Sequence, residues 1–189
     1  TADNGFIVYG KQLVKFDSSG NEEWNQTFEG IVGMDTRIEQ ASDGGYVIAE
    51  ITAFGGFDAL VIKTDSNGTE EWNQTFGGSG TDGIFSIQSV SDEGYIIAGY
   101  TNSFRNNSSY NGWLINIDLE GNEKWNKTFG GKYTDRFYSV TQDYSGQYIA
   151  TGATQSFGNT NQSNSDIWIV KVDDKGNEIW NQTFGDDND

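Results

Sequence analysis

The sequence predicts an all-β fold, a β-propeller of four-stranded antiparallel blades with about four blades in this chain. The phrase Trp-Asn-x-Thr-Phe occurs four times, beginning at Trp24, Trp72, Trp125 and Trp180, and so recurs every 48 to 55 residues. A fixed period of this size is typical of repeat architectures. Short apolar runs separated by Gly, Asn and Asp turns fill each interval, and no segment has convincing helical periodicity.

The first repeat, residues 1–29, is partial. Apolar runs at 5–9 and 13–16 are followed by a turn at 17–21 and by the first Trp phrase. The later repeats contain one more strand before these runs. We therefore expect the first blade to lack its innermost strand.

The three full repeats, residues 30–77, 78–130 and 131–185, each contain four predicted strands within what we treat as a single domain. In each repeat three strands precede the Trp phrase, which forms the fourth. In the second repeat they lie at 34–38, 46–49 and 58–62, and in the third at 82–87, 95–98 and 113–117. In the fourth repeat they lie at 135–140, 148–150 and 167–170. The two middle strands are continuously apolar, which is typical of strands buried on both faces. Four-stranded units repeated radially make a β-propeller, whereas a sandwich would show alternation in most strands.

A Gly-containing turn, Asp-x-x-Gly-Asn-Glu in its fullest form, connects the third and fourth strands. The Gly can adopt the left-handed conformation that closes a short hairpin, and the Asp can accept backbone N–H bonds.

Composition excludes several kinds of chemistry. The chain has no cysteine and no histidine, which removes thiolate catalysis, iron–sulfur clusters and the commonest general base. A net charge of −17 repels phosphate backbones, so we expect no nucleic-acid partner. No apolar run approaches the ~18 residues of a membrane-spanning helix. The chain begins at Thr1 rather than Met, which predicts a processed product or an excised segment.

Several phrases resemble a known family of repeats. Residues 77–82 (Gly-Gly-Ser-Gly-Thr-Asp), 92–95 (Asp-Glu-Gly-Tyr) and 98–103 (Ala-Gly-Tyr-Thr-Asn-Ser) resemble the β-propeller repeats of bacterial and archaeal secreted and surface-layer-type proteins. The hairpin at 117–125 is similar to the tryptophan-docking hairpin of quinoprotein-type propellers. The resemblance implies a secreted or cell-surface protein whose Trp24, Trp72, Trp125 and Trp180 pack between adjacent blades. Since the adjacent-cysteine pair of enzymatic quinoproteins is missing and there are far fewer blades, we expect no cofactor.

Two kinds of side chain are candidates for modification or metal binding. Asn-x-Ser/Thr sequons, which accept glycans in secreted proteins, occur at Asn25, Asn67, Asn73, Asn106, Asn107, Asn126, Asn161 and Asn181. Four of them belong to the Trp phrase, so repeat consensus is an alternative explanation. Asp35, Asp82 and Asp135 open the first strand of their repeats and are weak Ca²⁺ candidates. Because no copy matches a full calcium loop, we favour turn and strand capping for them.

The expected function is that of a non-catalytic structural or adhesion scaffold outside the cell. Its partners would be itself, neighbouring surface proteins or glycans. Self-association is expected because an incomplete first blade exposes an unpaired strand edge. A carbohydrate-binding propeller is the alternative, although the tryptophans repeat at one strand position, as packing residues do. A glycoside hydrolase with paired carboxylates comes third, since the acids recur with the repeat and a catalytic pair should break that symmetry.

Overall fold

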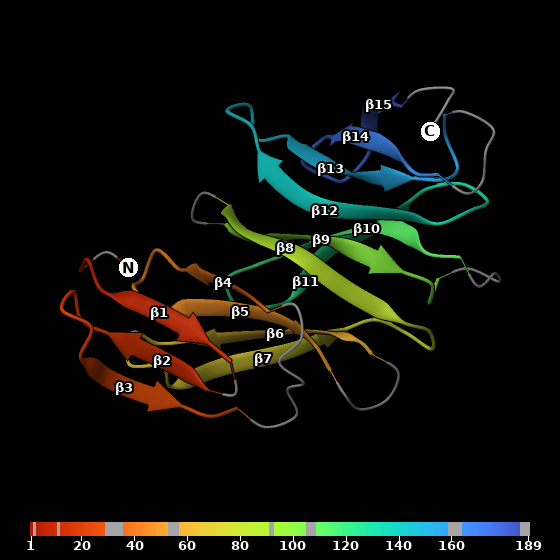
Figure 1. Cartoon of the computed structure of the whole chain (residues 1–189). Helices are drawn as coiled ribbons and strands as arrows, with labels where there is room; N and C mark the ends of the chain where they lie inside the picture. Colours follow the sequence, from red (N-terminus) through yellow and green to blue (C-terminus); the bar gives the residue numbers. More distant parts are fainter. Residues whose placement is uncertain are drawn as a thin grey trace.

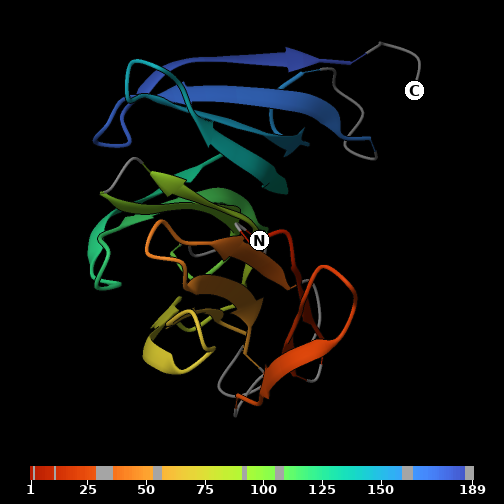
Figure 2. The ribbon, with the colours of Figure 1, turned by 90° about the vertical axis from the view of Figure 1, so that its left-hand side faces the viewer.

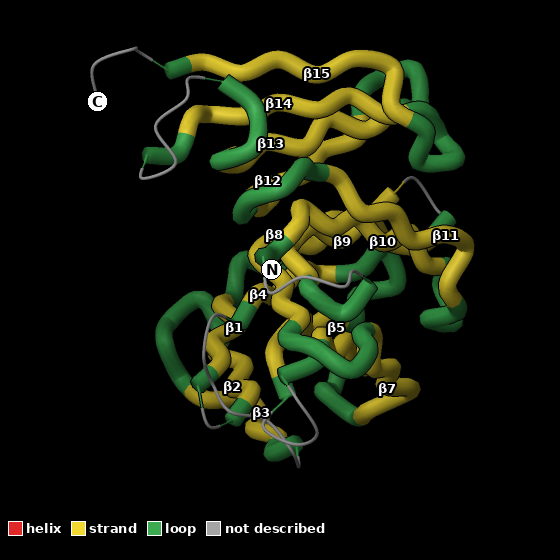
Figure 3. The backbone as a smooth tube through the Cα atoms, turned by 90° about the vertical axis from the view of Figure 1, so that its right-hand side faces the viewer, coloured by secondary structure: helices red, strands yellow, loops and turns green. Residues whose placement is uncertain are grey.

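The computed structural model describes residues 1, 3–10, 12–28, 36–52, 57–90, 93–104, 109–158 and 164–185. Within these residues every regular element is a strand, and Figure 3 shows strands joined by loops throughout. The strands form one sheet of three and three sheets of four. The prediction of an all-β chain with a three-stranded first unit is therefore confirmed. The described part of the chain has no helix long and apolar enough to span a membrane.

Each sheet is an antiparallel meander in which every strand pairs with the next one along the chain. The first sheet contains β1 (Phe6–Tyr9), β2 (Leu13–Phe16) and β3 (Glu22–Gln26). The second contains β4 (Arg37–Gln40), β5 (Tyr46–Ile51), β6 (Ala59–Thr64) and β7 (Glu70–Phe76). The third contains β8 (Asp82–Val90), β9 (Gly94–Thr101), β10 (Asn111–Ile117) and β11 (Glu123–Phe129). The fourth contains β12 (Asp135–Gln142), β13 (Tyr148–Thr154), β14 (Asp166–Val172) and β15 (Glu178–Phe184).

The sheets follow one another in chain order, with the first and fourth at opposite ends (Figures 1 and 2). One apolar cluster lies between each successive pair of sheets. Leu13 and Ile48 belong to the first cluster, Val61 and Ile97 to the second, and Leu114 and Val170 to the third. Burying apolar surface on both faces is what holds the inner two sheets, since this is the dominant favourable term in folding.

Burial along the strands follows from this order. In the inner sheets β5, β6, β9 and β10 are buried almost throughout, as continuous apolar runs predict. In the end sheets β2 and β14 alternate between buried and more exposed residues, because only one face of each meets a neighbour. The sequence prediction of two buried faces therefore holds for the inner sheets and is wrong for the fourth.

The turn between the third and fourth strands of each sheet has the same geometry in all four copies. Gly20, Gly68, Gly121 and Gly176 have φ of 84°, 78°, 82° and 76°, the left-handed region that favours glycine. At the last turn, the Asn177 backbone N–H donates to Asp173 Oδ1 over 2.7 Å. Hydrogen bonds from the Asn177 side chain and backbone hold the pKa of Asp173 below its usual range.

The first strands of the second, third and fourth sheets are joined by side-chain contacts. Arg37 Nε donates to the Phe85 carbonyl over 2.8 Å, and the Gln142 N–H donates to Gln88 Oε1 over 3.2 Å. The pairing register shifts at Phe85 in β8 and at Tyr138 in β12, so each strand has a bulge there. A bulge redirects a side chain, and these two bulges place aromatic rings where the sheets converge.

Candidate functional site

Three of the four repeated tryptophans lie at the boundaries between sheets. The ring of Trp24 is 5.8 Å from that of Tyr46, Trp72 is 6.5 Å from Tyr95, and Trp125 is 5.9 Å from Tyr148, each pair tilted by 60°. In each pair the tyrosine belongs to the following sheet. Trp72 Nε1 also donates to the Leu119 carbonyl over 3.0 Å, and Trp125 Nε1 to the Asp174 carbonyl over 2.9 Å.

The turn glycine of the following sheet receives each of these rings. A Cβ added to Gly68, Gly121 or Gly176 would lie between 2.5 and 2.9 Å from the nearest atom of Trp24, Trp72 or Trp125. Real Cβ atoms do not approach so closely, so the ring fits only against glycine. The contact is thus a ring inserted between a tyrosine and a glycine turn, made three times.

Trp180 differs from the other three. It is 41% exposed, whereas Trp24, Trp72 and Trp125 are partly buried and pack against the apolar clusters. The expectation that Trp180 is largely buried between blades is wrong for this chain, because no described sheet follows β15.

The calcium candidates hold the ends of their strands. Asp135 accepts hydrogen bonds from Ser156 Oγ at 2.6 Å and from the Gly131 N–H at 2.9 Å. Asp82 accepts the equivalent bonds from Ser103 Oγ at 2.5 Å and from the Gly78 N–H at 2.9 Å. Within the described ranges no group of three or more acidic residues is arranged to hold a metal ion. Asp35 lies outside the described residues.

Asp82 also faces a second carboxyl group, that of Asp58 at the start of the adjoining β6 strand. Burial and the charge and hydrogen bond of Asp82 raise the pKa of Asp58. Glycosidase carboxyl pairs stand about 5–9.5 Å apart so that a sugar or water fits between them. Here Gly77 stands against both carboxyl groups, since a Cβ added to it would lie 2.4 Å from Asp58 Oδ1 and 2.6 Å from Asp82 Oδ2, so the arrangement differs from that of a glycosidase pair. In the next repeat Asn111 occupies the position of Asp58. There Gly130 lies against Asn111 and Asp135, as Gly77 lies against Asp58 and Asp82.

The candidate glycan acceptors are mostly accessible. Asn25, Asn67, Asn73 and Asn181 are exposed, and Asn126 is half-buried. Asn106, Asn107 and Asn161 lie outside the described residues. In the Trp phrase each Asn donates from Nδ2 to a glutamate three residues earlier, over 2.6–2.7 Å. These pairs are Asn25 with Glu22, Asn73 with Glu70, Asn126 with Glu123, and Asn181 with Glu178.

Two grooves recur with the repeat. One of about 520 Å³ lies beside Trp125 and Tyr148, and one of about 350 Å³ lies beside Trp24 and Tyr46. Equivalent residues line both grooves, so they mark sheet boundaries rather than a site that is particular to one repeat.

An aromatic cluster around Arg136 occurs once among the described residues. The Arg136 guanidinium carbon lies 5.0 Å from the ring centroids of both Tyr100 and Tyr110, within the range of cation–π attraction. Tyr100 and Tyr110 meet edge to face with centroids 5.0 Å apart. The bulge residues complete the group, since Phe85 is 5.3 Å from Tyr100 and 5.2 Å from Tyr138.

This cluster borders a depression in the surface of the fourth sheet. The depression has a volume of about 250 Å³ and is lined by Thr134, Arg136, Tyr138, Ala153, Gln155 and Ser165. Tyr138 is 48% exposed. Arg136 Nε is shielded from solvent and has no hydrogen-bond partner in the described structure. The depression therefore presents an exposed ring, a cation, an amide and hydroxyl groups together.

The sequence analysis did not find this cluster. Its residues come from β8, β9, β12 and the segment before β10, and only the fold brings them together. The one signal in the sequence is the aromatic at equivalent positions of two repeats, in Ile84-Phe85-Ser86 and Phe137-Tyr138-Ser139.

Comparison with known proteins assigns the chain to no family. No family model and no curated protein matches the chain. Among solved structures, the chain is similar to an endo-1,4-beta-xylanase from Bacteroides thetaiotaomicron with a TM-score of 0.47 and 13% identity. The match covers 96% of this chain and 75% of the xylanase chain.

This comparison corrects two expectations. We expected a non-catalytic structural or adhesion scaffold and no enzymatic activity, whereas the similar structure is described as an endo-1,4-beta-xylanase. The sequence expectation rested on the absence of histidine and cysteine and on the recurrence of the acidic residues with the repeat, which a catalytic carboxylate pair should break. At this similarity the comparison assigns no role to any residue of this chain.

Proposed function

We propose that the four sheets are successive blades of a β-propeller and that the depression beside Arg136 binds carbohydrate. The propeller arrangement is supported by the repeated Trp contact between sheets and by the convergence of β4, β8 and β12. The carbohydrate site is supported by one observation above all, the combination of the exposed Tyr138 ring with the side chains of Arg136 and Gln155 in one depression.

The chemistry of a sugar matches these groups. A pyranose ring has an apolar face of C–H groups, which packs on an aromatic face, and a rim of hydroxyl groups that need hydrogen-bond partners. Tyr138 supplies the ring, and its hydroxyl group both donates and accepts. Arg136 supplies donors, and the Gln155 side chain supplies a donor and an acceptor. Sites of this kind are concave, with a few polar groups that fix the ligand's orientation.

Rigidity favours binding at this site. Tyr100 and Tyr110 both pack against the Arg136 guanidinium, so little side-chain freedom is lost when a ligand arrives.

The charge of the chain selects among sugars. A net charge of −17 repels an anionic ligand over the distance that salt does not screen, about 8 Å at physiological ionic strength. We therefore assign a neutral saccharide to the site rather than one that contains uronic acids.

A glycan array that contains neutral and uronate-bearing oligosaccharides tests this function. We expect saturable binding to neutral glycans that Tyr138→Ala and Arg136→Gln each abolish. Tyr144→Ala is the matched control, because Tyr144 is fully exposed and lies outside the cluster, and it should bind as the parent does. Absence of saturable binding, or equal binding by Tyr138→Ala and Tyr144→Ala, refutes the proposal. Preference for uronate-bearing glycans would refute the charge argument.

A further inference from the structure

The Trp contact between successive sheets is made three times. Each of its two halves also occurs once more without a partner, the inserting half on the fourth sheet and the receiving half on the first. One half consists of a Trp on the last strand of a sheet and the residue two positions later, which both face the next sheet. In the fourth sheet these are Trp180 and Gln182, and Trp180 is 41% exposed. The other half consists of an aromatic residue at the start of the second strand and a turn glycine, which receive the Trp.

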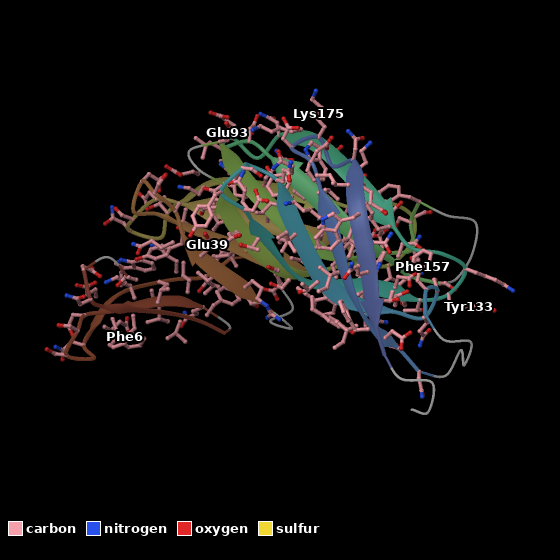
Figure 4. The ribbon with its side chains drawn as sticks, turned by 90° about the horizontal axis from the view of Figure 1, so that it is seen from above. Phe6, Glu39, Glu93, Tyr133, Phe157 and Lys175 are labelled. Atoms are coloured by element: carbon pink, nitrogen blue, oxygen red, sulfur yellow. The ribbon has the colours of Figure 1, made fainter. Side chains whose placement is uncertain are left out.

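The first sheet has the receiving half. Phe6 follows Gly5 as Tyr46 follows Gly45 and Tyr95 follows Gly94, so Phe6 occupies the tyrosine position of the contact. It is 57% exposed, whereas Tyr46 and Tyr95 are each 1% exposed. Figure 4 shows Phe6 on the N-terminal sheet at the edge of the molecule.

The turn glycine of the first sheet is likewise uncovered. Gly20 has φ of 84°, as its counterparts do, but a Cβ placed on it has nothing within 4 Å. At Gly121 the same Cβ would lie 2.9 Å from Trp72 and 3.1 Å from Gln74. Gly20 thus has the conformation of the receiving turn without a ring against it.

Other residues on the outer faces of the first and fourth sheets are also more exposed than their equivalents between sheets. Val8 on the first sheet is 53% exposed, whereas Ile48 at the equivalent position of the second sheet is fully buried. Phe184 on the fourth sheet is 50% exposed, whereas its equivalent Phe76 is 8% exposed. The side chain of Lys171 is 21% exposed, compared with 4% for Lys63, which the third sheet covers.

We propose that a second copy of this chain docks on these faces head to tail, with Trp180 of one copy inserted between Phe6 and Gly20 of the next. Each copy has both complementary halves, which is why the occupant is a second copy rather than an unrelated protein. Such an interface is heterologous, so it builds a ring if the rotation closes and a filament if it does not.

Two further features of the interface follow from the contacts already seen. By analogy with Trp72 and Trp125, the Nε1 of Trp180 donates to the carbonyl of Ser18, which occupies the position of Leu119 and Asp174. The inserting face lies on β14 and β15 and the receiving face on the first sheet. The carbohydrate depression is instead lined by residues of β12 and β13 and the residues that flank them, together with Ser165 just before β14. Docking and sugar binding are therefore separable by mutation.

Ionic strength should favour the association. Each copy has a net charge of −17, and the repulsion between copies is screened as salt is added. The docking contact itself is aromatic and apolar, so salt does not weaken it. We therefore expect larger assemblies at higher salt.

Complementary face variants test the proposal. Phe6→Glu breaks the receiving face and Trp180→Glu breaks the inserting face. Both residues are exposed in the single chain, so both variants should fold, which thermal unfolding of the dilute variants checks. By light scattering, the parent should form species of two or more 20.9 kDa chains as concentration rises, and each variant alone should stay at one chain. An equimolar mixture of the two variants should give a species of two chains, because one intact pair of faces remains.

The result expected for the control is unchanged association by Tyr144→Glu, since Tyr144 is exposed and outside both faces. A parent chain that stays single at every concentration and salt level overturns the proposal. So does a mixture of Phe6→Glu and Trp180→Glu in which every species remains a single chain. Neither result bears on glycan binding, which the Tyr138 variant tests separately.

Discussion

The difference between Trp125 and Trp180 gives a sharp test of the contact between sheets. The two residues occupy the same place in the same repeated phrase, so replacing each by Ala makes the same chemical change. Trp125 lies 5.9 Å from Tyr148, fits against Gly176 and donates to the Asp174 carbonyl over 2.9 Å. In the dilute single chain Trp180 is 41% exposed.

The magnitude follows from these contacts. Removing a buried Trp side chain costs about 3–5 kcal/mol, and because Trp125 is partly buried we take the lower end, about 3 kcal/mol. A loss of this size lowers the melting temperature of a chain of this length by roughly 6–12 °C. Trp180→Ala changes an exposed residue, and its effect should stay within about 0.5 kcal/mol.

Thermal unfolding followed by circular dichroism measures both variants. It must be done at a concentration at which light scattering shows a single chain, since association would stabilise the parent through Trp180. Equal losses of melting temperature for the two variants would refute the assignment of the Trp as the contact between successive sheets.

Three other changes have definite expected outcomes. Burial and Asp82 raise the folded pKa of Asp58, so the parent loses stability as pH rises from about 4 through that pKa. Asp58→Asn copies Asn111 of the next repeat and should raise the melting temperature at pH 7 more than at pH 4; a loss at pH 7 contradicts this. Gly20→Ala should cost about 1–2 kcal/mol in the single chain through its positive φ, and Gly121→Ala should cost more because its Cβ meets Trp72. We also propose that the sequons are used, so glycosidase treatment of protein from its native source should lower its mass, and an unchanged mass contradicts this.

The repeat and its turns could be predicted from the sequence because both are local. The Trp phrase fixes the period, and an Asp-x-x-Gly turn has one favourable backbone geometry, which Gly68 and Gly121 adopt. The solvent exposure of the outer face of the fourth sheet could not be predicted. Ile167 is as apolar as residues of the inner sheets, yet it is 61% exposed, because its burial depends on whether another sheet follows.

The candidate carbohydrate site could not be predicted because its parts are far apart in the sequence. Phe85 and Arg136 come together only because two sheets pack on each other. A bulge, which residue propensities do not predict, places Tyr138 beside the depression. The Asp58–Asp82 pair could not be predicted for the same reason, since each residue alone resembles a strand cap. The repeated motifs could therefore be recognised in the sequence, whereas contacts between residues of different repeats could not.

The three separate apolar clusters have a consequence for how the chain loses its structure. Each cluster joins only neighbouring sheets, so the free energy of the fold is close to a sum over adjacent pairs. An end sheet can detach by breaking one cluster, whereas an inner sheet must break two. Amide hydrogens of β1–β3 and β13–β15 should therefore exchange with solvent before those of β5, β6, β9 and β10, and order should be lost from the ends inward.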